Sequence, residues 1–228
     1  MYRRVLTMQD ISCVGQCSTT VALPILSACG LEACILPTAL LSTHTGGFGK
    51  PAAVHFDGAL TDIWHHWQEN GITFDAILVG YLGSLEAVKA AGEIIDRLLA
   101  PGGVAIVDPA MADNGKLYSG FDEDYVRAIG SLAGKADIIL PNVTEAAILS
   151  GLPYQENIDR NYVNQLLNGL NHPCAVLTGV DFDEDSTGIV LQEGTVQHEY
   201  RHKRIGTGCH GTGDIFAAVF TGALMQGK

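Results

Sequence analysis

Basic residues and long apolar runs are both scarce in this sequence. Lys and Arg together number 13 against 25 Asp and Glu, which gives a formal net charge of -12. That balance argues against sequence-independent binding to nucleic acid, which requires a basic face. No apolar run reaches the roughly 18 residues of a membrane span, and the N-terminus lacks the long apolar core of a signal peptide. We therefore expect a cytoplasmic protein that binds neither nucleic acid nor a membrane.

Internal repeats and low-complexity linkers are also missing. With 228 residues and a hydrophobic content of 47%, the chain can bury the core of one large domain. A small anionic ligand stays compatible with the acidic composition, because backbone N–H groups and metal ions can build a local anion site.

Six cysteines are present, and the first four have the spacing C-x3-C-x11-C-x4-C of a loose zinc site. Cys29 closes an apolar helical stretch and Cys34 lies in a strand-like run, so four converging thiolates are not expected. Reduced, mostly buried thiols suit a cytosolic chain better. Cys209 is the exception, because it lies inside a glycine-rich stretch.

Strand-like and helix-like segments alternate along the chain. Residues 74–80 and 104–107 are continuous apolar runs of the kind found in buried parallel strands. Residues 188–191 and 195–202 flank Glu193-Gly194 as a hairpin would. The pattern predicts an α/β fold with a central, mainly parallel sheet and a small antiparallel hairpin. We further expect a short first strand at residues 5–8 and a turn at residues 101–103.

A glycine-rich stretch near the C-terminus organises the rest of the chain. Gly211-Thr212-Gly213-Asp214 runs into an apolar segment that is rich in Ala, so Gly211, Thr212 and Gly213 should present backbone N–H groups at a helix N-terminus. Such N–H groups and the helix dipole attract an anion. A phosphate would repel Asp214, which is instead well placed to take a proton from an attacking hydroxyl. A simple capping role for Asp214 is the alternative.

Polar residues follow several of the predicted strands. The carboxyl ends of parallel strands meet at the sheet edge where open α/β folds bind ligands. A carboxylate there, such as that of Asp108, is costly unless a metal or a cation pairs with it. For Ser12, an ordinary turn hydroxyl is the alternative. The residues that we expect on this edge are Ser12, Thr45, Tyr81, Asp108, Asn142, Thr178 and Asp214.

Asn142 and Glu145 are three residues apart at a helix start. This spacing favours a capping box, with Asn as N-cap and Glu as its reciprocal partner. The alternative is that Glu145 points into the site and holds Mg²⁺, directly or through water. Residues 114–121 are predicted to form a mobile lid.

Five motifs occur in the order expected of one known fold: Ser42-Thr43-His44-Thr45-Gly46-Gly47, Val79-Gly80-Tyr81-Leu82-Gly83, Val107-Asp108-Pro109-Ala110-Met111-Ala112-Asp113, Pro141-Asn142-Val143-Thr144-Glu145-Ala146, and Gly211-Thr212-Gly213-Asp214. From Val5 to the last residue, the chain resembles the ribokinase-like superfamily and, within it, the pyridoxal/pyridoxamine/pyridoxine kinases. The resemblance implies a three-layer α/β/α fold and ATP-dependent phosphorylation of the 5′-hydroxymethyl group of a B6 vitamer. It also implies a homodimer, Mg²⁺ with ATP and often a monovalent cation, generally K⁺.

The resemblance also implies a role for each candidate residue. Asp214 would be the base at the reacting hydroxyl, and Gly211, Thr212 and Gly213 would hold the γ-phosphate. The remaining roles are substrate contacts for Ser12, Thr45 and Tyr81, contacts to ATP for Asp108, Asn142, Glu145, Thr178 and Gly179, metal binding for Asp108 and Glu145, and lid positions for Asp113 and Tyr118.

Three departures from the family pattern are present. Gly-Thr-Gly occurs at residues 206–208 as well as 211–213, and the first register would put Cys209 at the base position, as in hydroxymethylpyrimidine kinases. We choose the second register because Asp214 directly precedes the apolar helix, and we keep Cys209 as a candidate reactive thiol. Ala110 and Ala112 replace other residues of the pattern, which should alter lid mobility. Relatives usually continue with further helices, so we expect the chain to lack the last C-terminal helices, at a cost in nucleotide affinity.

Three other functions compete with a B6-vitamer kinase. A hydroxymethylpyrimidine (phosphate) kinase would have the same fold and little turnover of pyridoxal. A catalytically weak vitamer-binding protein would bind pyridoxal without forming ADP. A sugar kinase is less favoured, because Thr45 and Tyr81 with few charged side chains suit a flat ring better than a polyol.

Overall fold

The chain divides into two units, Met1–Asp108 with Cys209–Lys228 and Pro109–Gly208, and each is described by itself. The computed structural model describes residues 3–181, 183–205 and 209–228. The first of the two Gly-Thr-Gly sequences, residues 206–208, therefore lies outside the described residues.

The first unit contains a five-stranded sheet in the order β5-β4-β1-β2-β3. Four of its strands run parallel, and β3 pairs with β2 in the antiparallel direction. Val5, Leu6 and Met8 of β1 are fully buried at the centre of this sheet. The strands are β1 (Arg4–Ser12), β2 (Glu32–Leu41), β3 (Ala53–His55), β4 (Phe74–Val79) and β5 (Leu99–Val107).

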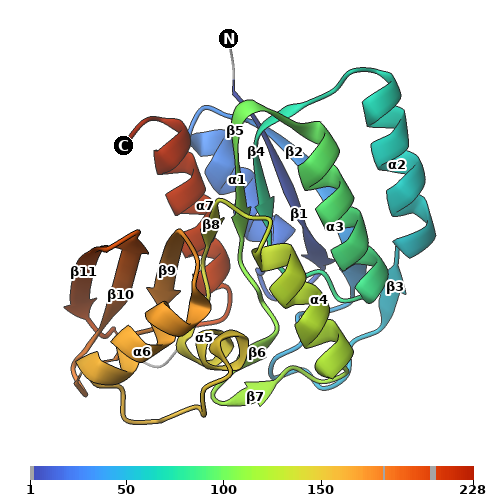
Figure 1. The fold of residues 1–228 in the computed structure, drawn as a ribbon. Coiled ribbons are helices and arrows are strands. Elements are labelled where there is room, and N and C mark those ends of the chain that lie inside the picture. The colour runs from blue at the N-terminus through green and yellow to red at the C-terminus, as the bar shows by residue number, and fades with distance from the viewer. Residues whose placement is uncertain (1–2, 182, 206–208) are drawn as a thin grey trace. The chain divides into compact units, whose positions relative to one another are not determined.

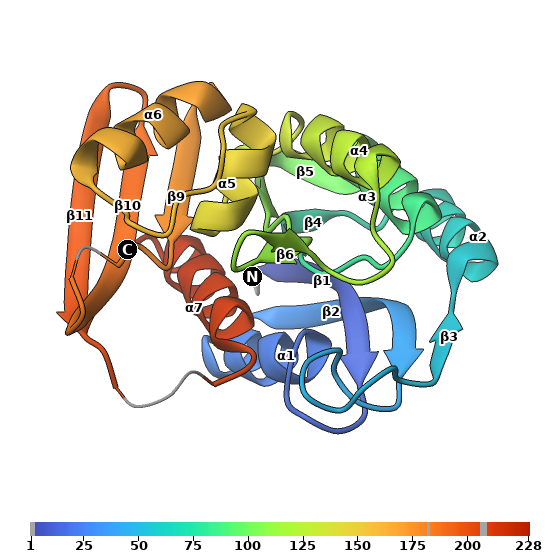
Figure 2. The same ribbon diagram turned by 90° about the horizontal axis from the view of Figure 1, so that it is seen from below.

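Four helices cover the two faces of this sheet, so the unit has three layers. Helices α2 (Asp57–Glu69) and α3 (Leu85–Leu98) lie on one face, and α1 (Thr19–Ala28) and α7 (Thr212–Met225) lie on the other (Figures 1 and 2). Ala22 and Leu26 of α1 share a buried cluster with Ala218 and Met225 of α7. The C-terminal helix is thus packed beside the first one.

The second unit contains four strands in the order β11-β10-β9-β8. β8 (Ile138–Ile139) and β9 (Cys174–Thr178) are parallel, whereas β10 (Ser186–Glu193) and β11 (Val196–Lys203) form an antiparallel hairpin. A separate small hairpin joins β6 (Ala112–Asp113) to β7 (Lys116–Leu117). The helices are α4 (Glu123–Ala133), α5 (Val143–Ser150) and α6 (Arg160–Leu170).

The architecture confirms the predicted α/β class, with mainly parallel pairing and an antiparallel hairpin. Two local expectations were wrong. β1 does not end at Met8 but continues to Ser12, because β2 goes on pairing with it beyond a register shift between Gln9 and Ile11. The predicted turn at residues 101–103 is part of β5, where a register shift against β4 accommodates the two glycines. Among the described residues, no helix is long and apolar enough to cross a membrane.

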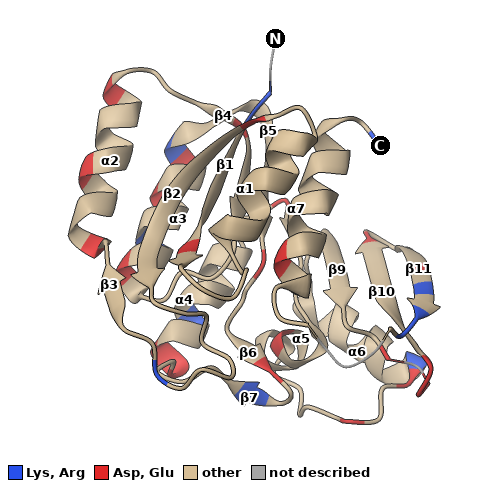
Figure 3. Ribbon diagram, turned by 180° about the vertical axis from the view of Figure 1, so that it is seen from behind, with Lys and Arg blue, Asp and Glu red and all other residues tan. Residues whose placement is uncertain are grey.

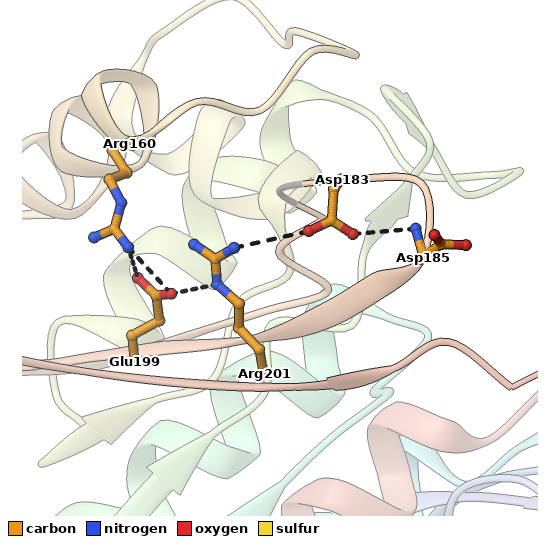
Figure 4. A network of polar contacts seen from close by, with 5 residues as sticks. All are labelled: Arg160, Asp183, Asp185, Glu199 and Arg201. Carbon is orange, nitrogen blue, oxygen red and sulfur yellow. Dashed lines mark hydrogen bonds and ion pairs between the residues drawn. The ribbon is translucent and has the colours of Figure 1, made fainter.

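Charged residues are spread over the surface of both units. Acidic residues lie on most of the helices, and basic ones gather on β11 (Figure 3). At that strand, Arg160 Nη2 lies 3.0 Å from Glu199 Oε2, and Arg201 contacts both Glu199 and Asp183 (Figure 4). The side chains of Arg160 and Asp183 are 73% and 54% exposed, and those of Arg201 and Glu199 keep 32% and 25% of their surface in contact with solvent, so the network adds little stability. It borders a surface hollow of about 600 Å³ lined by Asp183, Asp185, Ser186, Arg201, His202 and Lys203, none of them a predicted site residue.

Candidate active site

The N-terminus of α7 lies in the first unit and is formed by the glycine turn Gly211-Thr212-Gly213. Gly211 is the N-cap and has left-handed backbone angles, with φ at 77°. The first hydrogen bond within the helix joins the N–H of Ile215 to the carbonyl of Gly211, at 2.9 Å. The N–H groups of Thr212, Gly213 and Asp214 precede that bond and have no acceptor inside the helix. The turn can therefore present donors to an anion.

Asp214 does not cap its own helix. It is the third residue of α7, and its Oδ2 accepts a hydrogen bond of 2.9 Å from the N–H of Ser18, just before α1. Burial raises the pKa of Asp214 to about 6, the Ser18 N–H lowers it, and the charge of Asp10 raises it. The alternative of a capping aspartate is thus wrong, and the carboxylate has the proton affinity of a general base that works near neutral pH.

Asp10 interacts with two of the predicted site residues, Ser12 and Tyr81. The hydroxyl of Ser12 donates to Asp10 Oδ2 at 2.9 Å, and both residues are buried. Burial raises the pKa of Asp10, and hydrogen bonds from Ser18 and Ser12 lower it. The pKa of the Tyr81 phenol is raised by burial and by the charge of Asp10. Ser12 is the last residue of β1, so the alternative of a turn hydroxyl is wrong.

Asp108 follows β5 directly, and its carboxylate approaches the first turn of α7. A Cβ atom placed on Gly213 would lie 4.0 Å from Asp108 Oδ2. Ser12 ends β1, and Tyr81 and Asp108 come after β4 and β5, so all three lie at one edge of the first sheet, as predicted. Thr45 lies exposed in the loop after β2.

Sequence reasoning missed two residues of this site, Asp10 and Ser18. Asp10 lies just beyond the apolar run of residues 5–8, where the first strand was expected to end, so its costly burial within β1 became visible only in the structure. Ser18 donates its backbone N–H to Asp214 and its hydroxyl to Asp10, and neither tertiary contact leaves a pattern in the sequence around Ser18.

In the second unit, Asn142 and Glu145 form the predicted capping box of α5. Asn142 Oδ1 accepts from the N–H of Glu145, and Glu145 Oε2 accepts from the N–H of Asn142, both at 2.9 Å. Glu145 Oε1 accepts from the N–H groups of Met111 at 2.9 Å and Ala112 at 3.4 Å. Burial raises the pKa of Glu145 to about 7, against these hydrogen bonds, which lower it. The Glu145 carboxylate thus links the motif of residues 107–113 to the motif of residues 141–146.

Thr178 is the last residue of β9, and Gly179 follows it directly. The N–H of Thr178 donates to the carbonyl of Pro141 at 2.9 Å, which places it beside the Asn142 turn. Gly179 is exposed. The second unit therefore brings Asn142, Glu145, Thr178 and Gly179 together.

The predicted lid begins with the β6–β7 hairpin. Asn114 and Gly115 form its tight turn, with φ at 51° and 74°, as an Asn-Gly pair favours. Asp113 is exposed, and its Oδ1 accepts from the N–H of Asn114 at 2.9 Å. The N–H of Tyr118 donates to the carbonyl of Met111 at 2.9 Å. Lid movement stays a prediction.

All six cysteines lie in the described part of the chain, and they are free. The expectation of mostly buried thiols was wrong: Cys13 and Cys209 are exposed, and the other four are half-buried. Burial and the charges of Asp214 and Asp10 raise the pKa of Cys17 to about 11. The role of Cys209 as a reactive thiol stays a prediction.

The chain is similar to known kinases over nearly its whole length. The model of the phosphomethylpyrimidine kinase family matches residues 24–228. A pyridoxine/pyridoxal/pyridoxamine kinase of Bordetella avium is 32% identical over 98% of this chain and 78% of its own length. The crystal structure of pyridoxal kinase from Lactobacillus plantarum is 37% identical with a TM-score of 0.90, over 100% of this chain and 82% of its own.

A third relative comes from Bacteroides thetaiotaomicron. This protein, assigned as a phosphomethylpyrimidine kinase and crystallised in a form with pyridoxal, is 32% identical with a TM-score of 0.93, over 100% of this chain and 82% of its own. The family match over residues 24–228 and the identities of 32% to 37% show more than a shared fold. The chain therefore belongs to the phosphomethylpyrimidine kinase family and is a relative of the pyridoxal kinases.

Proposed function

We propose that this kinase transfers the γ-phosphoryl group of ATP to the 5′-hydroxymethyl group of pyridoxal, pyridoxamine or pyridoxine. The observation that carries the proposal is Asp214, a carboxylate whose pKa is raised to about 6, in the first turn of a helix whose N-terminus can hold an anion. The pyridoxal-bound relative from Bacteroides thetaiotaomicron supports this choice of substrate.

The residues of the first unit would bind the vitamer and activate its hydroxyl. Ser12, oriented by Asp10, would hydrogen-bond a polar substituent of the pyridine ring, with Thr45 and Tyr81 as further contacts. Asp214 is mostly ionised above pH 6 and would accept the proton of the hydroxymethyl group as its oxygen attacks phosphorus. The N–H groups of the glycine turn would stabilise the charge of the transferring phosphoryl group.

The residues of the second unit would bind ATP. Asn142, Thr178 and Gly179 are proposed to contact the nucleotide, and residues 114–121, with Asp113 at their root, to close as a lid that excludes water.

Mg²⁺ would accompany ATP and neutralise charge on its phosphates. Asp108 fits as a ligand, because its carboxylate is only half-buried and stands at a strand end. Glu145 would contact Mg²⁺ through a water molecule and not directly. Three backbone N–H groups already occupy most of the about four acceptor positions of its carboxylate. K⁺ as an accessory cation and a homodimer are proposed from the family resemblance, and a cytoplasmic location from the composition of the sequence.

A hydroxymethylpyrimidine (phosphate) kinase is the second candidate, because the family model that matches the chain has that description. The two candidates differ in the ring that the enzyme accepts, so comparing substrates separates them.

The experiment measures ADP release with Mg²⁺-ATP and each of pyridoxal, pyridoxamine, pyridoxine and hydroxymethylpyrimidine. We expect turnover of the vitamers, and a kcat that is roughly 10²–10⁴-fold lower in Asp214→Asn, the loss typical of a missing general base. Asp62→Asn, on the exposed side of α2, is the matched control and should leave kcat unchanged. Turnover of the pyrimidine alone would establish the second candidate, and pyridoxal binding without turnover would contradict both.

A further inference from the structure

Two histidines of the first unit pack ring against ring next to the glycine turn, in a tilted contact that is here called the histidine stack. The ring centroids of His44 and His210 are 4.3 Å apart, with 39° between the ring planes. His44 is buried, with 7% of its surface exposed, and His210 is exposed. Phe48 meets the His44 ring edge-on, at 5.0 Å between centroids. The two histidines come from loops more than 160 residues apart in the chain, so the contact is tertiary.

The tautomer of His44 follows from one hydrogen bond. Its Nδ1 accepts from the N–H of Gly46 at 3.0 Å, so in the neutral ring the proton is on Nε2. Burial and the neighbouring His210 both lower the pKa of His44, which keeps this ring neutral near pH 7. The stack therefore does not suffer from the repulsion of two imidazolium charges.

Glycines make room for both rings. A Cβ atom on Gly15 would overlap the ring of His44, and a Cβ atom on Gly46 would lie 2.9 Å from His210 Cε1 and 3.2 Å from its Nδ1. A Cβ atom on Gly211 would lie 2.6 Å from the carbonyl oxygen of Gln16. Three loops thus fit closely against one another: residues 13–17, residues 42–49 and residues 209–211.

Each of these loops leads directly to a proposed site residue. Residues 42–49, here called the substrate loop, contain Thr45, the neighbour of His44. His210 immediately precedes Gly211, the N-cap of α7. The loop of residues 13–17 leads to Ser18, whose N–H holds the carboxylate of Asp214. The histidine stack is therefore the contact between the loop that would bind substrate and the turn that would bind phosphate.

We propose that the stacked pair of His44 and His210 is a positioning element that fixes the substrate loop against the glycine turn, so that vitamer and phosphoryl group are held in register. Neither ring needs to touch substrate: His210 acts through Gly211 to Gly213, and His44 acts through Thr45. The inference rests on the proposed function, because it assigns the substrate loop to the vitamer.

Gly46→Ala tests the stack without altering the main chain. Gly46 has no positive φ, so alanine fits its backbone, and the added methyl group meets His210 first. His210→Ala removes the ring itself. Once the ring is gone, the methyl group at position 46 has nothing left to displace, so the double variant should behave like His210→Ala alone.

We expect kcat/KM for pyridoxal at saturating ATP to fall roughly 10-fold in Gly46→Ala and in His210→Ala, within the range of coupling between residues in contact. The double variant should show the same 10-fold fall, and His210→Phe, which keeps an aromatic ring, should recover most of the loss. His66→Ala, an exposed histidine of α2, is the matched control. Thermal unfolding should shift little in His210→Ala, because His210 is exposed.

Wild-type values in both single variants would overturn the inference, and so would losses that multiply in the double variant or that follow a falling unfolding midpoint. Failure of the proposed function looks different, because the wild-type enzyme itself would then not turn over pyridoxal. In that case pyridoxal binding, measured by calorimetry without nucleotide, decides: weaker binding in both single variants supports the positioning role, and unchanged or absent binding overturns it.

Discussion

At the scale of single residues, the pKa of Asp214 is set by burial and by two residues from distant parts of the chain, Ser18 and Asp10. The Ser18 N–H lowers its pKa, whereas burial and the charge of Asp10 raise it to about 6. Asp10 is a buried residue of β1 and Asp214 a half-buried residue of α7, so two carboxylates from distant parts of the chain influence each other. One group in such a pair gains a pKa close to the working pH of a general base.

The pH dependence of catalysis follows from this pKa. A base must be ionised, so kcat/KM for the vitamer should be constant above neutral pH and fall tenfold per unit well below about pH 6. Asp10→Asn removes the charge that raises the pKa of Asp214, so the acid limb should move to lower pH. Initial rates between pH 5 and 8, in buffers of constant ionic strength, measure both. An acid limb that stays in place in Asp10→Asn would contradict the coupling of these carboxylates.

At the scale of elements, the start of α5 combines structure and function in one carboxylate. Glu145 closes the capping box and also holds the N–H groups of Met111 and Ala112. In Glu145→Gln, the amide nitrogen is a donor and cannot accept any of these bonds, so a buried N–H is left unpaired. We expect a loss of about 1–3 kcal/mol in the free energy of unfolding.

Urea denaturation at pH 8, where the wild-type carboxylate is ionised, measures this loss. Glu156→Gln, an exposed position of the same unit, is the control and should leave the free energy of unfolding unchanged. Equal stability of Glu145→Gln and wild type would mean that the carboxylate serves the site alone.

The β6–β7 hairpin and the residues that follow are the proposed lid. Closure over nucleotide would add to the protection of the amide hydrogens of residues 114–121, because most of this segment is exposed and only some of its N–H groups are hydrogen-bonded. We expect hydrogen exchange there to slow when Mg²⁺-ATP is added to Asp214→Asn, which cannot complete the reaction. Exchange in α2 should stay the same and provides the internal reference. Unchanged exchange in residues 114–121 would identify the hairpin as a fixed wall.

The secondary structure was predictable where local signals agree. The Asn142 and Glu145 spacing predicted the capping box, and Glu193-Gly194 marked the β10–β11 hairpin. The sequence failed where tertiary pairing overrides local preference. Gln9 and Asp10 are polar, yet β1 continues through them because β2 pairs alongside. Gly102 and Gly103 signal a turn, yet they extend β5.

The proposed site residues were predictable from the sequence where they belong to a recognisable local pattern. Asp214 and the glycine turn have a distinctive pattern, and Ser12 and Tyr81 follow strands. The support for these residues was not predictable, because it is made by contacts between distant segments. The Ser18 N–H on Asp214 and the His210 ring on His44 depend on how α7 and its glycine turn pack beside α1 and the substrate loop. No spacing within the sequence encodes such a contact.

At the scale of the whole molecule, the proposed contacts to the vitamer all lie in the first unit, and most proposed contacts to ATP, apart from those of Asp108 and the glycine turn, lie in the second. Ser12, Tyr81 and Asp214 belong to the first unit, and Asn142, Thr178 and Gly179 to the second. Within the first unit, the substrate residues depend on Asp10 and Ser18, whereas Thr178 depends on Pro141 in the second. The hydrogen bonds named for Ser12 and Asp214 thus belong to a different unit from the bond named for Thr178.

This division predicts opposite effects of two conservative variants. Ser12→Ala removes the hydroxyl that Asp10 orients, so the Kd for pyridoxal should rise about 2- to 10-fold, the effect of one hydrogen bond, with the Kd for ATP unchanged. Thr178→Val keeps the side-chain shape and should raise the Kd for ATP alone. Calorimetry measures both constants directly, because KM equals Kd only when chemistry is slow, and Ser27→Ala, exposed on α1, is the control. A variant that weakens both ligands equally would mean that the two sets of contacts are not independent, and the assignment of vitamer and nucleotide to separate units would be wrong.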